Sequence, residues 1–398
     1  MIALLLALFC ALSLSFLGQL HQAMDMSAGI VLVWGIGIFL LPRPSQNGWR
    51  LIAAAALLRL VLLPVESGMD ANLPSLLEDA TGLWVGGNPY AGGTPSPFSP
   101  LKLWLMAPLQ DLESVETIIR LLSISADLFV VWLLAALLHM RKRRIDGAWL
   151  YALHPLGALE SAVHMSLTAP VIACALLAAL AWMRGRSGLG WASLGGLLGA
   201  TPLVMIPALW KRSGWIIVLA GMVGIVLLWP LSDSGAGLWD GIVRGVTASG
   251  MPGILALLLS WLNSSILHTL CTVTGLLILI QIWMRWRDPI DILLWSTAAW
   301  VLVAPTLEAT AILWVWVPAI VCGQRAWGIL ATLAPLSYLC LPSADLTLLT
   351  QANTEWIPWV VFLPFLLSFG AEFVRHQTRP GPWQAGPARN TSPSPSLI

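Results

Sequence analysis

Four carboxylates gather in one polar stretch of this chain. Glu66, Asp70, Glu78 and Asp79 fall in the first half of residues 65–100, and the second half is rich in Gly and Pro. A carboxylate can take the proton from an attacking hydroxyl group, so general-base catalysis is the chemistry that such a cluster offers. Long loops with their own polar clusters carry function more often than they merely connect elements.

The 398-residue chain as a whole is strongly apolar. It is 58% hydrophobic and 10% charged, with a mean hydropathy of +0.82, whereas a soluble chain is about 25% charged. We therefore expect an all-α, polytopic transmembrane helical bundle with about 12 to 14 membrane segments of roughly 20 residues each. The candidate segments run about 2–20, 28–42, 51–64, 117–139, 146–163, 166–183, 188–210, 214–231, 252–283, 290–304, 310–322, 326–341 and 356–372.

Some segments leave a choice open. Residues 188–210 form one helix or a pair broken around Gly199 and Pro202, and residues 252–283 are long enough to include an interfacial turn. Residues 1–20 lack a basic start, so we interpret them as a retained first helix and not as a secretion signal. The cysteines lie in apolar segments without CxxC spacing, which is typical of small core residues.

The distribution of charge predicts the orientation of the bundle. Basic residues cluster between segments, most strongly at Arg141 to Arg144, and short loops with Lys and Arg face the cytoplasm. A single transmembrane topology places all these basic clusters on the cytoplasmic side and the loops 65–100 and 232–250 on the opposite side. We expect a cell-membrane, multi-pass protein with a transmembrane domain over 1–372, a disordered cytoplasmic tail over 373–398, and both termini cytoplasmic.

The outer loop contains a predicted short helix that lies along the membrane surface. Pro74 suits a helix start, and Gly86 with Gly87 suits a helix end, so the helix spans Leu73 to Val85. Asp79 then lies within this helix. The alternative is that its carboxylates only solvate the exposed face.

The order of residues after this helix resembles a known loop. Asp79, then Gly86, Asn88, Pro89 and Tyr90, stand in the register of the first outer loop of GT-C-type glycosyltransferases, which are integral membrane enzymes that use polyprenyl-phosphate sugars. Asn72 occupies the register of the family's first acidic residue, and Asp70 lies two residues earlier. The resemblance therefore implies a catalytic base at Asp70 or Asp79, and the sequence leaves the choice open.

Two further stretches resemble the same family. His154-Pro-Leu, followed by Glu160 and His164, is similar to the family's Asn-Pro-Leu-x-x-x-Glu motif, and Pro305 to Glu308 is similar to its Pro-x-x-His motif. Glu160 and His164 are four residues apart and share a helix face. An ionisable pair within a span suggests a site, although a polar contact between helices is the alternative.

Cations on the outer side are scarce. Lys102, Arg120 and Arg244 lie there, and a lipid-phosphate donor needs such cations near the membrane plane; the alternative is interfacial snorkelling. Arg59 lies inside the third segment and needs a carboxylate partner that sequence alone does not name. No metal site and no cofactor are indicated, although a divalent metal is compatible with the resemblance.

These residues together predict a hexosyltransferase. The resemblance implies transfer of a mannose-like hexose from a polyprenyl-phosphate donor to a lipid or glycan acceptor at the extracytoplasmic face. The expected base is Asp70 or Asp79, and the substrate-binding candidates are Asn88, Tyr90, Lys102, Arg120, Glu160, His164, Arg244 and Glu308. The expected partners are these substrates and membrane lipids, with no nucleic acid. The alternatives are a transporter or flippase for a lipid-linked or polar solute, and an inactive GT-C-like scaffold.

Overall fold

The described part of the chain is helical. The computed structural model describes residues 2–17, 24–41, 48–65, 72–91, 95–110, 112–199, 201–210, 222–223, 226, 231, 237–238, 240, 251–340 and 356–378. These residues form no β-strand, and an isolated bridge joins Met251 to Leu307. The helices of the first half are α1 (Ile2–Leu17), α2 (Met24–Leu40), α3 (Gly48–Leu62), α4 (Asn72–Trp84), α5 (Pro100–Met106), η1 (Ala107–Leu109), α6 (Val115–Met140), α7 (Asp146–Leu153), α8 (Pro155–Ala162), α9 (Thr168–Met183) and α10 (Leu189–Leu198).

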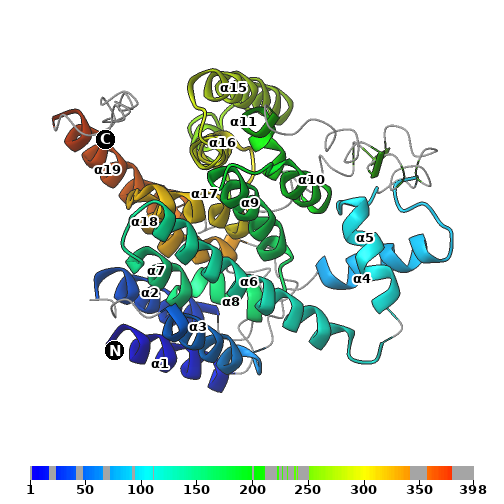
Figure 1. Ribbon diagram of the computed structural model, residues 1–398, viewed down its shortest axis with the longest axis horizontal. Coiled ribbons are helices and arrows are strands. Elements are labelled where there is room, and N and C mark those ends of the chain that lie inside the picture. Colours follow the sequence, from blue (N-terminus) through cyan, green and yellow to red (C-terminus); the bar gives the residue numbers. More distant parts are fainter. Residues whose placement is uncertain are drawn as a thin grey trace, which may run out of the picture.

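The second half continues the same pattern. Its helices are η2 (Thr201–Met205), α11 (Ile206–Leu209), α14 (Ile254–Leu258), α15 (Ser264–Arg285), α16 (Pro289–Val303), α17 (Ala309–Cys322), α18 (Ala326–Leu333), η5 (Ala334–Cys340) and α19 (Ile357–Thr378). Most of the long helices pack into one bundle, whereas α4 and α5 lie together at one end of it (Figure 1). The start of α1 and the end of α19 lie toward the other end.

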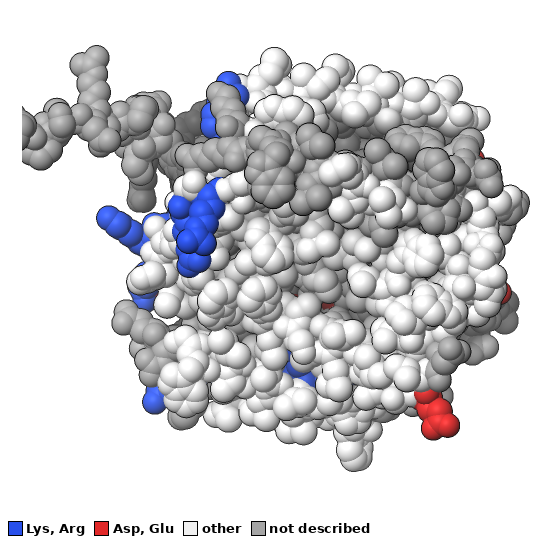
Figure 2. Space-filling model, turned by 45° about the vertical axis from the view of Figure 1, so that its right-hand side comes forward, with Lys and Arg blue, Asp and Glu red and all other residues white. Residues whose placement is uncertain are grey.

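Three helices are long and apolar enough to cross a membrane. They are Val115–Met140, Ser264–Arg285 and the Ile357–Val374 part of α19, and several shorter apolar helices accompany them. The α15 helix is little buried by its neighbours, and large side chains such as Leu277 and Met284 are exposed on it. The face in Figure 2 is mostly uncharged, with Lys and Arg gathered toward one side and acidic residues toward the other.

An ionic network lies at the centre of the bundle. Arg59 on α3 pairs with Asp127 on α6, and both residues are at most 1% exposed. Tyr151 on α7 donates a hydrogen bond to the second oxygen of the same carboxylate at 2.6 Å. The guanidinium also donates to the carbonyl oxygens of Ala55 and Ala152. A buried charge is tolerated only when paired and hydrogen-bonded, and this network meets both conditions while joining three helices.

The stretch 146–163 differs from a single continuous helix. It is divided into α7 and α8 at His154, whose backbone is extended because Pro155 follows it. The His154 Nδ1 atom accepts a hydrogen bond from Leu156 N and caps α8, while Nε2 contacts Thr332 Oγ1 at 3.1 Å. Trp34 donates to the carbonyl freed at Leu153 at 2.7 Å. The polar groups exposed by the break are therefore satisfied within the bundle.

The other helix boundaries are set by local turns and capping residues. Residues 188–210 form the broken pair, because α10 ends at Gly199 and η2 packs back against it. The expected turn within 252–283 lies between α14 and α15, where Asn263 caps the second helix through Ser265 N. The tail differs from expectation, because α19 continues to Thr378. Residues 373–378 are thus helical where disorder was expected, and 379–398 lie outside the described residues, as does most of 214–231.

We predict that Asp127→Asn lowers the free energy of unfolding by about 3–5 kcal/mol, because it leaves Arg59 buried without a counter-charge. Denaturation in mixed detergent micelles measures this change. The matched control is Glu116→Gln, which removes the partner of Arg120 at a site where the carboxylate is 61% exposed; the expected loss is below about 1 kcal/mol. Equal losses for the two variants would contradict a central role for the buried pair.

Candidate functional site

The helix predicted in the outer loop is present as α4. Gly86 adopts φ +86°, and Gly87 N donates to Gly82 O at 2.8 Å, which is the hydrogen-bond pattern of a glycine-terminated helix. Leu76 and Leu83 are buried on one face of α4. On the same helix Asp79 is partly buried and Glu78 is exposed. The packing of α4 therefore distinguishes the two neighbouring carboxylates.

The Asn-Pro-Tyr turn after α4 is held by its own side chains. Asn88 Oδ1 accepts a hydrogen bond from Tyr90 N at 3.0 Å, and Tyr90 OH donates to Phe98 O at 2.5 Å. Tyr90 is 1% exposed, and burial together with the charge of Asp79 raises the pKa of its hydroxyl group. Tyr90 thus stays a neutral hydrogen-bond donor close to Asp79.

A separate hydrophobic cluster supports this turn. We call residues 72–110, which include α4, α5 and η1, the outer lobe. Its buried side chains pack with Ile119 of α6, Met165 and Leu231. A Cβ atom on Gly237 would lie 2.0 Å from Tyr90 O, so only glycine fits at that contact. The second outer loop therefore touches the first.

Lys102 and Glu308 come from distant parts of the sequence and interact electrostatically. Lys102 lies on α5, with its Nζ atom 5.1 Å from the centre of the Phe98 ring, and Glu308 precedes α17. Burial lowers the pKa of Lys102 to about 8, and the nearby charge of Glu308 opposes that shift. Burial also raises the pKa of Glu308, which Thr310 and Lys102 partly counteract. Each group therefore stabilises the charged form of the other.

The backbone fixes the position of Glu308. Met251 and Leu307 exchange two hydrogen bonds, at 3.0 and 2.7 Å, and Gly253 N donates to Ala304 O at 3.1 Å. A Cβ atom on Gly253 would lie 2.7 Å from that carbonyl oxygen, so glycine permits the close approach. Glu308 is therefore held by a short bridged loop.

Arg120 is already occupied by protein groups. Its guanidinium donates to Glu116 at 2.9 Å and to Leu63 O at 2.5 Å, at the end of α3. The residue is 9% exposed. Arg120 therefore caps the C-terminal end of α3. Its Nε atom is buried and has no hydrogen-bond partner among the described residues.

Glu160 lies in the last turn of α8, but the helix ends at Ala162, so His164 follows it and the two side chains do not share a helix face as expected. Glu160 is 4% exposed and interacts electrostatically with Tyr151 of the central network. His164 is partly buried, and the next residue, Met165, turns the chain with φ +50° into the outer-lobe cluster. This segment therefore links the buried network to the outer lobe.

The structure brings Asp79, Tyr90, Lys102 and Glu308 into one set. Asp79 acts electrostatically on Tyr90, and Glu308 acts electrostatically on Lys102. Phe98 contacts both Tyr90 and Lys102. Two further candidates, Asp70 and Arg244, lie outside the described residues. The described residues contain no cluster of His, Cys, Asp and Glu suited to a metal ion.

Sequence reasoning missed two residues that the structure makes important. Asp127 is the partner of Arg59, and the available signal was an acidic residue within an apolar segment, a position that is costly without a partner. Phe98 contacts both Tyr90 and Lys102, which no spacing indicated. No known protein-family model matches the chain, and comparisons with curated proteins and solved structures found no significant match either.

We predict that the Lys102 amine titrates near pH 8, so that it is mainly a cation at pH 7 and loses its charge as the pH rises through 8. Glu308→Gln should lower this pKa further, because the carboxylate favours the charged amine. The chain has three lysines, so ¹³C-methylation of the amines and NMR across pH 6–11 resolves them, with Lys102→Arg assigning the signal. An unchanged titration in Glu308→Gln would contradict the pairing.

Proposed function

We propose that this chain is a multi-pass membrane glycosyltransferase of the GT-C type. It would move a mannose-like hexose from a polyprenyl-phosphate donor to a lipid or glycan acceptor at the extracytoplasmic face of the cell membrane. The observation that carries the proposal is that the charge of Glu308 acts on Lys102, whose Nζ atom lies over the Phe98 ring beside the Asp79–Tyr90 turn. A cation, two carboxylates and a neutral donor are thereby gathered at one end of an apolar bundle.

The charge distribution supports the membrane orientation. The α6 helix begins beside Glu116 and ends at the basic run Arg141 to Arg144. Lys and Arg gather on one side of the face in Figure 2, and acidic residues lie toward the other. Short basic loops face the cytoplasm, so the outer lobe would lie on the opposite side.

In the proposed transfer, a carboxylate of the outer loop acts as the general base. Asp79 or Asp70 accepts the proton of the acceptor hydroxyl as its oxygen attacks the anomeric carbon. The C–O bond to the lipid phosphate breaks as the new glycosidic bond forms, so the configuration inverts. Tyr90 remains protonated beside Asp79 and fixes the turn that carries it.

Lys102 is suited to the leaving phosphate. With a pKa of about 8 the amine is mainly charged at pH 7, and its burial weakens competition from water. Glu308 keeps the amine charged while the site is empty. Arg120 holds the neighbouring end of α3, so we assign it a supporting position beside the site.

The buried central network supports transfer over transport. A transporter would place its ionisable groups around a polar cavity at mid-depth. Arg59, Asp127 and Tyr151 are instead 0–1% exposed and hydrogen-bonded to one another. At the outer end Asp79, Lys102 and Glu308 are partly exposed, which favours transfer over transport.

We predict that at least one of the single variants Asp79→Asn and Asp70→Asn lowers kcat for hexose transfer by a factor of about 10²–10⁴. This factor is the usual contribution of a general base. The assay uses membranes that contain the full chain, a polyprenyl-phosphate hexose donor and extracted lipid acceptors. Lys102→Gln should lower kcat/KM and change its pH profile above pH 8, where the wild-type cation is lost.

The matched control is Glu78→Gln, since Glu78 lies next to Asp79 on α4 but is exposed. We expect its activity to equal that of the wild type. If both Asp variants transferred hexose at the wild-type rate, the base would lie elsewhere. Transport of the donor without transfer would favour the flippase alternative, and the absence of both activities would favour an inactive scaffold.

A further inference from the structure

A basic cavity lies at the opposite end of the bundle from the outer lobe. Its volume is about 520 Å³, and it opens between the α6–α7 turn and the α17–α18 turn. Its cations are Lys142, Arg143, Arg144 and Arg325, and Asp146 is the acidic residue among those that line it. The proposed transfer reaction uses none of these residues.

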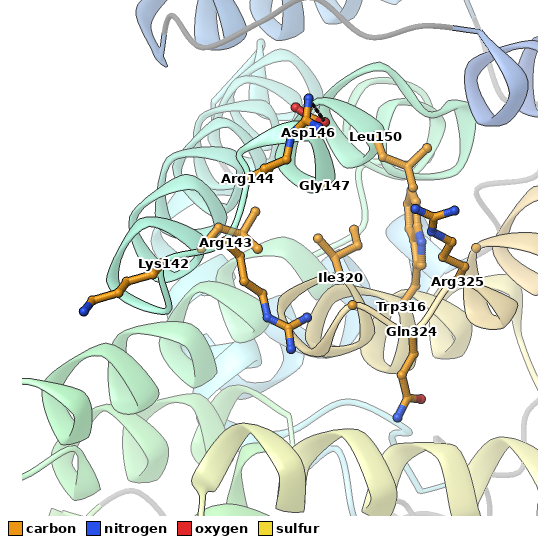
Figure 3. Close-up of a pocket in the computed structure, with 13 residues that line it drawn as sticks. Lys142, Arg143, Arg144, Asp146, Gly147, Leu150, Trp316, Ile320, Gln324 and Arg325 are labelled. Carbon is orange, nitrogen blue, oxygen red and sulfur yellow. Dashed lines mark ion pairs between the residues drawn. The ribbon is translucent and has the colours of Figure 1, made fainter. Parts of the chain in front are cut away.

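The floor of the cavity is apolar. Leu138, Leu150, Trp316 and Ile320 contribute to its lining and are 1–8% exposed, so they form a closed surface within the bundle. Figure 3 shows Arg143 and Arg325 approaching from opposite sides, with Ile320 and Trp316 between them, while Lys142 extends outward at the rim. The site therefore combines an apolar wall with a cationic rim, which suits a ligand that carries both kinds of surface.

Some of this charge has a local explanation. A Cβ atom on Gly323 would lie 2.1 Å from Arg143 Nη1, so Arg143 packs against the end of α17, where a cation favours the helix dipole. Arg144 pairs with Asp146 at 3.1 Å. Arg143 also acts electrostatically on Asp291. These contacts account for Arg143 and Arg144.

The side chains of the other two cations have no such described contact, although Lys142 follows the C-terminus of α6 and Glu372 accepts a hydrogen bond from Arg325 N at 3.1 Å. Lys142 and Arg325 are exposed, and the ion pairs of the described residues include neither of them. Lys142 also adopts φ +53°, a left-handed conformation that costs a side chain about 1 kcal/mol and that glycine adopts freely. A lysine in a conformation that favours glycine, on the rim of a basic cavity, suits a position where its charge binds a ligand.

We infer that this cavity binds a phosphate group, carried by an anionic amphiphile whose apolar part lies against Trp316 and Ile320. Basic pockets between helices at the cytoplasmic end bind lipid head groups in this way, and Arg offers paired donors to phosphate oxygens. The inference rests on the membrane orientation proposed above but not on hexose transfer, because the two sites lie at opposite ends of the bundle.

The test measures binding to the purified full chain in a zwitterionic detergent. The probes are a monomeric short-chain phosphatidic acid, the matching phosphatidylcholine, and inorganic phosphate. We expect phosphatidic acid to bind and to raise the melting temperature, and phosphatidylcholine to do neither. Arg325→Gln should weaken binding about fivefold, and Arg143→Gln with Arg325→Gln about 25-fold, since each cation near a lipid phosphate contributes about 1 kcal/mol.

Two further variants distinguish a loss of binding from a loss of folding stability. Lys142→Gly should weaken binding about fivefold while leaving the melting temperature of the unliganded chain equal or higher, because glycine suits φ +53°. Arg186→Gln is the matched control, since Arg186 is an exposed cation of the α9–α10 turn outside the cavity. Its binding should equal that of the wild type.

The outcomes decide both the site and the source of its ligand. Binding of phosphatidic acid alone assigns a lipid phosphate, and equal binding of inorganic phosphate with the same variant pattern assigns a soluble one. Wild-type affinity in Arg325→Gln and in the double variant, or an equal loss in Arg186→Gln, would overturn the inference. Loss of hexose transfer in the Asp79 experiment has no bearing on these results.

Discussion

The buried contact between Arg59 and Asp127 is the constraint on which the arrangement of the bundle depends. Two full charges lie among apolar helices, and each is tolerated only while the other is present. The pair fixes the rotation of α3 and α6, and Tyr151 adds α7 by binding the same carboxylate. Apolar packing alone permits several rotations of such helices, whereas a shared carboxylate permits very few.

The central network and the outer lobe are connected through α8. Pro155 interrupts the helix, and His154 caps the new start while its ring packs 4.3 Å from that of Trp316. The eight residues of α8 then carry Glu160 to the outer end. Displacing the break by one residue would rotate Glu160 by about 100° around the helix axis, since α-helices have 3.6 residues per turn. The position of the proline thus sets the direction of an acidic group near the candidate site.

The sequence alone predicted the features that depend on residues close together in the chain. The helix of the outer loop and its glycine end follow from local capping chemistry, and they were predicted within a few residues. A turn was expected somewhere within 252–283, and the structure places it before α15. Apolar content predicted the helical class. The partner of Arg59 was not predictable, because 68 residues separate it from Asp127 and any acidic residue in an apolar segment could have matched it. The electrostatic interaction of Lys102 with Glu308 joins residues even farther apart. The end of α19 was missed because Arg375 to Thr378 have a polar composition that is compatible with either a helix or a tail.

The length of α6 determines how far the outer lobe stands from the bilayer. Its 26 residues rise about 39 Å, while the hydrocarbon layer is about 30 Å thick. An upright helix whose basic end lies at the cytoplasmic boundary would project about 9 Å, or roughly six residues. That overhang contains Glu116 and Arg120, so their ion pair would lie among the head groups while Ser123 would lie in hydrocarbon. The phosphate of a membrane lipid occupies the same depth, so under the proposed function a sugar attached to it would reach the outer lobe without leaving the bilayer surface.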